Sequence, residues 1–174
     1  EEMLSTADTV AERARDGALR SEVQARLQAV QARRQRFDAV RDALDTLEDS
    51  PDDPAANETV GRYRCFVQGD WAAGLPHLAR GADEQLADLA RLELAEPEEP
   101  EERLALADGW WEVAEEQPAL ARQNVRARAA KWYRLAEPDL ASLDRTQARQ
   151  RLAEVEGAEQ EGGRADLPDV AGYA

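Results

Sequence analysis

The residues of this sequence best suited to acid–base or nucleophilic chemistry are its only histidine, His77, and its only cysteine, Cys65. A serine–histidine–acid triad would have to use His77, yet no glycine-flanked serine accompanies it. A thiol–imidazole pair would require both side chains to face each other across a helical hairpin, where apolar neighbours raise a thiol pKa rather than activate it. No local spacing predicts an acid cluster around His77 or Tyr133. We therefore expect no catalytic residue and no enzyme activity.

Metal and cofactor motifs are also missing from the sequence. One cysteine and one histidine cannot make a zinc site of the usual composition. The acidic pairs Glu98-Glu99 and Glu101-Glu102 lack the alternating spacing and the glycine of a calcium loop. The glycine pair at 162–163 is followed by neither a lysine nor a helix start, so it is not a phosphate loop. The sequence predicts no cofactor, and at most weak calcium binding at the surface.

Tryptophan is the most distinctive residue type of the chain, with four copies at positions 71, 110, 111 and 132. Adjacent Trp110 and Trp111 would lie about 100° apart on a helix, so both are buried only if the helix is covered on two sides. Two interpretations follow: a hairpin core with hydrogen-bonded indole donors, or a concave aromatic surface for a peptide or a glycan. The candidate partner surface comprises Trp71, Trp110, Trp111, Trp132 and Tyr133.

The composition of the chain favours helices. Apolar residues make up 43% of it but are mostly Ala, Leu and Val, with no Ile and only 5% aromatics. Ala, Leu, Arg and Glu are strong helix formers, whereas residues that favour strands are scarce. The length of 174 residues suits one domain with appended segments. We predict an all-α protein, and the preference for residues with GC-rich codons is typical of a bacterial genome.

The net charge of −15 argues against nucleic-acid binding, which needs a basic surface that releases counterions. Acidic residues cluster at 45–58, 93–102 and 154–161, either as solvated helix faces or as sites for a basic partner. No stretch approaches the roughly 20 apolar residues that span a bilayer, so no membrane insertion is expected. A start at Glu1 instead of Met is typical of a piece of a longer chain, and localisation stays open between exported and cytoplasmic.

Two helices are predicted before the first proline break. A short helix is capped at Ser5 or Thr6 and ends at Gly17, because glycine tolerates the geometry of a helix C-terminus. A second helix, at 18–48, would be about 40 Å long. Its apolar residues repeat at three- and four-residue spacing on one face, with Arg34 interrupting the series, and they are Leu19, Val23, Leu27, Val30, Phe37, Val40, Leu44 and Leu47. This narrow stripe predicts either packing on the following hairpins or a homodimer through the 18–48 helix.

Proline and glycine signals divide the remainder of the chain. The break at Asp49–Pro54 separates an N-terminal region, 1–48, from a hairpin domain, 49–156. The expected helices of this domain lie at 54–68, 71–80, 83–96, 101–116, 118–137 and 144–156. Beyond Gly157 small and polar residues predict a flexible tail or linker, 157–174.

The segment Ala56–Arg80 has the form of a tetratricopeptide unit, with a small residue, Gly61, on the first helix and Gly74 where the two helices approach. Leu104–Trp111 and Ala129–Ala136 repeat this pattern more loosely. We expect about two degenerate units of antiparallel helical hairpins. The long arm and the last helix would be their caps, because such arrays need about three repeats or capping elements.

The chain also resembles a tetratricopeptide-like helical module that recurs in planctomycete multidomain proteins. The resemblance covers about Arg13–Val155 and rests on Gly61, Tyr63, Cys65, Phe66, Gly69, Asp70, Trp71, Gly74, Leu75, Pro76, Leu78, Gly81, Asp108, Trp110, Trp111, Ala129, Ala130, Trp132 and Tyr133. Two departures are Asp108-Gly109, where the module has the small residue before the acid, and His77, where it has an apolar residue. The resemblance implies a helical fold and an interaction role, often in exported or surface proteins, with no assigned activity.

Three functions from different classes follow from these patterns. The leading prediction is a non-catalytic protein–protein interaction or scaffolding module, part of a larger protein, with a protein or peptide partner. The alternative is a ligand-binding module with an aromatic groove for a peptide or a glycan, which requires an accessible tryptophan. An enzyme is the least supported of the three.

Overall fold

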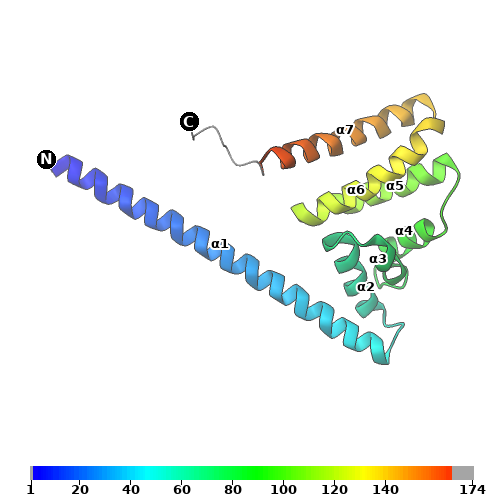
Figure 1. The fold of residues 1–174 in the computed structure, drawn as a ribbon, viewed down its shortest axis with the longest axis horizontal. Helices are drawn as coiled ribbons and strands as arrows, with labels where there is room; N and C mark the ends of the chain where they lie inside the picture. Colours follow the sequence, from blue (N-terminus) through cyan, green and yellow to red (C-terminus); the bar gives the residue numbers. More distant parts are fainter. Residues whose placement is uncertain (1, 166–174) are drawn as a thin grey trace, which may run out of the picture. The chain divides into compact units, whose positions relative to one another are not determined.

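The computed structural model describes the backbone of residues 2–165 and the side chains of residues 17, 19–28 and 30–158. This part of the chain is all-helical and contains no strand, which confirms the predicted fold class. The helices are α1 (Glu2–Asp49), α2 (Pro54–Arg62), α3 (Trp71–Leu78), α4 (Glu84–Leu94), α5 (Pro100–Glu115), α6 (Ala119–Ala136) and α7 (Ser142–Ala165) (Figure 1). A π-helical turn (Tyr63–Val67) follows α2, and a 3-10 turn (Glu137–Asp139) follows α6. None of the described helices is long and apolar enough to cross a membrane.

Helix α1 is uninterrupted, so the predicted helix end at Gly17 is wrong. A glycine inside a helix costs only about 1 kcal/mol relative to alanine, and the Ala, Arg and Glu residues around it favour the helix. The predicted short helix and long arm are therefore one element. The chain divides into two compact units within this helix, Glu1–Asp42 and Ala43–Ala174.

Helix α7 continues past Gly157 to Ala165, beyond its predicted end at Glu156. The Ala, Glu, Gln and Arg residues on both sides of Gly157 are strong helix formers and outweigh the cost of the glycine. The first part of the predicted flexible tail, 157–165, is therefore helical. The remainder, 166–174, lies outside the described residues.

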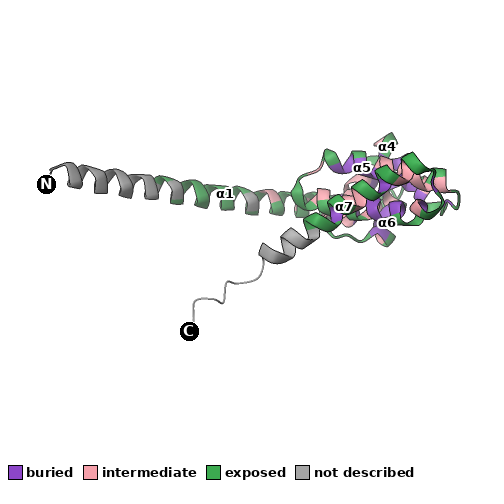
Figure 2. Ribbon diagram, turned by 90° about the horizontal axis from the view of Figure 1, so that it is seen from above, coloured by how far each residue is buried: buried purple, intermediate pink, exposed green. Residues whose placement is uncertain are grey.

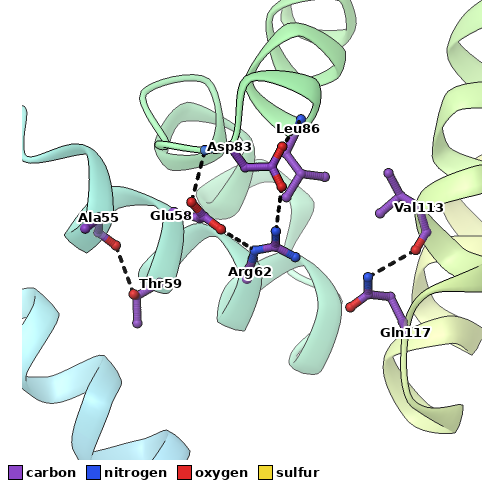
Figure 3. Close-up of polar contacts among 8 residues, drawn as sticks. All are labelled: Ala55, Glu58, Thr59, Arg62, Asp83, Leu86, Val113 and Gln117. Carbon is purple, nitrogen blue, oxygen red and sulfur yellow. Dashed lines mark hydrogen bonds and ion pairs between the residues drawn. The ribbon is translucent and has the colours of Figure 1, made fainter.

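The helices of the second unit start with the expected capping chemistry. Asp53, Asp70 and Asp83 precede α2, α3 and α4, and each carboxylate accepts a backbone N–H three residues further on, at 2.8, 3.1 and 3.1 Å. The start of α4 is also tied to α2 (Figure 3). Arg62 donates to Glu58 at 2.7 Å and to Asp83 at 2.8 Å, and the backbone N–H of Asp83 donates to Glu58 at 3.0 Å.

The core of the second unit centres on α5 and α6, and buried residues of the π-helical turn, α3, α4 and α7 pack against them. Buried residues gather on these helices, whereas the described part of α1 is mostly exposed (Figure 2). A smaller apolar cluster forms at the end of α1, where Ala43 and Leu47 pack on Ala56 and Val60 of α2. The last turns of α1 are therefore anchored to the second unit.

Two glycines let α2 and the π-helical turn approach α3. A Cβ at Gly61 would lie 2.8 Å from the backbone nitrogen of Leu78, and one at Gly74 would lie 2.3 Å from Cys65 Sγ. The wider turn leaves carbonyls without a helical partner. Asn124 of α6 donates to one of them, the carbonyl of Phe66, at 2.8 Å. The predicted close approach at Gly61 and Gly74 is thus present in the structure.

Glu96 ends α4 in the left-handed conformation, with φ +52°, and its N–H donates to the Glu93 carbonyl at 3.1 Å. Helices that end this way usually have glycine at this position. We expect Glu96→Gly to raise the free energy of unfolding by up to about 1 kcal/mol, because it removes the steric strain of the side chain. Urea titration measures the change. Glu98→Gly, at a residue with negative φ, is the control, and an equal loss of stability in both variants would contradict the prediction.

Candidate functional site

The five aromatic residues of the predicted partner surface lie in the core. Trp71, Trp111 and Trp132 are 8%, 8% and 5% exposed, and Trp110 and Tyr133 are fully buried. The rings of Trp71 and Trp110 meet edge to face at 5.1 Å, and those of Trp111 and Tyr133 meet at 6.3 Å. Helix α5 is thus covered on two sides, as burial of both adjacent tryptophans requires. Trp132 and Trp71 each line a surface hollow, but only with the small part of the side chain that stays exposed.

Glu93 on α4 is a buried carboxylate, only 3% exposed. Its Oε2 accepts the indole N–H of Trp110 on α5 at 2.7 Å, and its Oε1 accepts the Nε–H of Arg128 on α6 at 2.5 Å. The Arg128 guanidinium also lies 5.0 Å from the centre of the Trp71 ring. Because both oxygens are hydrogen-bonded and the charge is neutralised, the group holds three helices together. The Glu93 carboxylate is therefore not free for acid–base chemistry.

A second polar cluster joins α5, α6 and α7. Tyr133 donates to Asp108 Oδ1 at 2.5 Å, and the Arg151 guanidinium contacts both of these oxygens. Arg151 also lies 5.2 Å from the centre of the Trp111 ring. Burial and the hydrogen bond to Asp108 raise the pKa of Tyr133, so its hydroxyl stays protonated. Asp108, the acid near Tyr133 that an enzyme would need, is therefore already hydrogen-bonded within a helix–helix contact.

Cys65 and His77 have separate environments. Cys65 is fully buried, and burial, followed by the nearby Glu93 charge, raises the pKa of its thiol to about 12. Such a thiol is inert at neutral pH. His77 instead shares a hydrogen bond of 2.9 Å between its Nδ1 and Asn57 Oδ1. Among the described residues no three metal-binding side chains lie together.

The pKa of His77 is lowered by burial and by the charges of Arg64 and Arg80. The unfolded chain therefore binds a proton more readily as the pH falls below the ordinary value of 6.5. The contribution of the neutral ring to stability is complete above that pH and is lost as the pH falls through the folded-state pKa. We expect the free energy of unfolding to drop between about pH 7 and pH 5 in the wild type and to drop less in His77→Gln. Urea titrations across this range measure it, and parallel pH profiles would contradict it.

Two hollows open on the surface near Arg128 and Lys131, with volumes of about 380 and 290 Å³. The larger one is lined by acidic and basic residues together, including Glu96 and Lys131. The Lys131 ammonium lies 5.0 Å from the centre of the Trp132 ring. The indole N–H of Trp132, which lines the larger hollow, is buried and has no hydrogen-bond partner. Three glutamates, two arginines and a lysine line this hollow, and because their charges are of both signs they do not define the charge of a ligand.

The largest exposed apolar feature of the described residues is on α1. We call it the α1 stripe, and it comprises Leu19, Val23, Leu27, Val30, Phe37 and Leu44, which are 60%, 48%, 56%, 65%, 59% and 40% exposed. Side chains at these spacings share one face of a helix. The neighbouring Ala43 and Leu47 are turned toward α2 instead. The α1 stripe is therefore a separate face, and it is the candidate functional site.

Comparison with protein-family models, with curated proteins and with solved structures finds no match to this chain. The fold and the site define the chain as an all-helical protein with an exposed apolar stripe on a long helix. Of the predicted aromatic and apolar contact surfaces, this stripe is the one that the structure leaves accessible.

Proposed function

We propose that this chain is a non-catalytic protein–protein interaction or scaffolding module, which binds a protein or peptide partner through the α1 stripe. The observation that carries the proposal is the exposure of six large apolar side chains on one helix face. Exposed large apolar side chains that gather on one face mark interaction sites in folded proteins. An amphipathic helix also draws most of its stability from packing of its apolar face, which a partner would supply.

The second unit suits the role of a rigid support. Helices α2 and α3 pack together, as do α5 and α6, and each pair has a short connection. Gly61 and Gly74 allow the close approach within the first pair. These features support a tetratricopeptide-like arrangement of two degenerate hairpins, in which α7 and the end of α1 serve as caps. Buried ion pairs such as Glu93–Arg128 fix the hairpins to each other.

Other functions receive less support from the structure. The net charge of −15 disfavours a nucleic-acid partner. A glycan- or peptide-binding aromatic groove would need an accessible tryptophan, and the most exposed of the four retains only 8% of its surface. The groups with strongly raised pKa, Cys65 and Tyr133, are protonated and buried, which is the opposite of an activated nucleophile or base.

Site-specific photo-crosslinking in the producing cells tests the proposal. A photoreactive phenylalanine analogue replaces Phe37 in the α1 stripe, and the control carries it at Gln31, which is exposed on another face of α1. We expect a discrete protein adduct from position 37 and none from position 31. Equal labelling at both positions, or no adduct at position 37, would contradict the proposal.

A further inference from the structure

The apolar residues of α1 are spaced symmetrically about the middle of the arm. From Val23 the steps to Leu27, Val30, Phe37, Val40 and Leu44 are four, three, seven, three and four residues. This order of steps is the same in both directions along the helix. If two copies of the helix lie antiparallel, each of these six side chains meets an apolar side chain of the other copy. Val30 then lies beside the partner's Phe37, Leu27 beside the partner's Val40, and Val23 beside the partner's Leu44.

The charges on α1 are polarised along its axis. Residues 19–36 carry five arginines and one glutamate, whereas residues 37–49 carry five acidic residues and one arginine. In the antiparallel register that pairs these six side chains, Arg20 lies within one residue of the other copy's Glu48 and Arg26 within one residue of its Asp42, whereas Arg33 and Arg34 of both copies meet at the centre. A parallel pair in register would place each arginine beside the same arginine of the other copy, so that like charges would face each other along the whole length. The outer parts of the two helices thus favour the antiparallel orientation.

The accessible face of α1 is suited to this pairing. Val23, Val30, Phe37 and Leu44 follow one another at intervals of seven residues, which is the repeat that keeps two helices in contact as they supercoil. They span about three heptads, and the second core position of these heptads is apolar at Val40 but is occupied by arginine at Arg26 and Arg33. Their exposed fractions lie between 40% and 65%, so the face is free to receive a partner. Leu44 lies about 100° around the helix from Ala43, which packs on α2.

We infer that the partner covering the α1 stripe is a second copy of this chain, paired antiparallel with its own α1 and centred between residues 33 and 34. The inference rests on the proposed interaction role of the stripe and names the partner. The protein is then a dimer whose two second units are attached to opposite ends of a common two-helix arm, because α1 joins each second unit at its C-terminal end.

Sedimentation equilibrium of the full 174-residue chain tests the pairing. We expect the wild type to be a dimer and Val30→Glu to raise the dissociation constant by about a hundredfold, because each dimer would then lose the burial of two valine side chains against Phe37. Gln31→Glu adds the same charge on another face of the same turn and should dimerise like the wild type. Circular dichroism verifies that both variants stay helical. A monomeric wild type, or equal dimerisation of both variants, would overturn the inference.

Disulfide cross-linking tests the orientation. Chains with Val23→Cys are mixed with differently tagged chains with Leu44→Cys and then oxidised. Antiparallel pairing predicts a cross-link between the two variants and none within either variant alone, whereas parallel pairing predicts the reverse and would overturn the inference. Buried Cys65, whose thiol is protonated at neutral pH, does not compete.

The photo-crosslinking experiment separates failure of this inference from failure of the proposed function. An adduct of position 37 with another copy of the chain supports both. An adduct with a different protein, together with a monomeric purified chain, overturns self-pairing and leaves the interaction role standing. A monomeric chain that forms no adduct at position 37 overturns both.

Discussion

Glu93→Ala is expected to lower the free energy of unfolding by about 3–5 kcal/mol, because it leaves a buried guanidinium without its counter-ion. The Arg128 side chain is 18% exposed and the Glu93 side chain 2%. The substitution also removes the acceptor of the Trp110 indole N–H, 2.7 Å away. Chemical denaturation monitored by tryptophan fluorescence measures the loss. A loss of this size would be a large share of the stability of a small domain.

Two further variants separate the buried charge from the lost side-chain volume. Asp88→Ala removes a carboxylate from the same helix, but the Asp88 side chain is 78% exposed, and its ion pair with Arg91 should be worth less than about 1 kcal/mol. The double variant Glu93→Met/Arg128→Met replaces both charges by apolar groups and should recover most of the stability. A double variant as unstable as Glu93→Ala would show that the ion pair is not the source of the effect.

The sequence predicts the helices well where local signals are strong. Asp53 before Pro54 predicts the start of α2, and the aspartates before α3 and α4 cap their helices in the structure. The errors occur at Gly17 and Gly157, which lie inside helices. Glycine is a signal for a helix end only when the flanking residues also favour one. Its cost of about 1 kcal/mol is small beside the propensity of many surrounding helix formers.

Whether the aromatic residues are buried or accessible depends on tertiary contacts, which cannot be read from the sequence. Helical spacing shows that Trp110 and Trp111 point in different directions, but not that α5 is covered on both sides. Arg126 lies 4.7 Å from the centre of the Trp111 ring, at a distance of fifteen positions along the chain. Long-range pairs of this kind decide whether a tryptophan is a core residue or a binding surface.

Sequence reasoning also missed Glu93, although a signal for it exists. Glu93 follows Leu86, Leu89 and Ala90 at the spacing of one helix face, so it lies on the apolar face of α4. A lone glutamate on such a face predicts a buried counter-ion. That this counter-ion is Arg128, thirty-five residues away, follows only from the contact between α4 and α6 in the structure. The apolar face of α1, in contrast, follows from periodicity, although its exposure does not.

The close packing of α3 on the π-helical turn predicts a second large effect. Alanine normally favours a helix over glycine by about 1 kcal/mol, yet a Cβ at Gly74 would lie 2.3 Å from Cys65 Sγ and 3.0 Å from the Cys65 backbone nitrogen. We expect Gly74→Ala to lower the free energy of unfolding by about 2–3 kcal/mol, since the turn and α3 must move apart. Urea titration measures this. Gly157→Ala is the matched control, because a Cβ there meets nothing within 4 Å, and it should be neutral or stabilising.

Cys65→Ala identifies the clashing atom. Alone, it removes a buried sulfur and should cost about 1–2 kcal/mol through the cavity that it leaves. In the Gly74→Ala background the same substitution should instead raise the free energy of unfolding, because the new methyl group occupies the space of the sulfur and the two substitutions couple favourably by more than about 2 kcal/mol. Rescue stays incomplete, since the backbone nitrogen of Cys65 and the Cβ of Arg64, 3.1 Å from the added methyl, cannot be removed. Additive losses in the double variant would mean that the backbone contact alone sets the spacing of α3 and the turn.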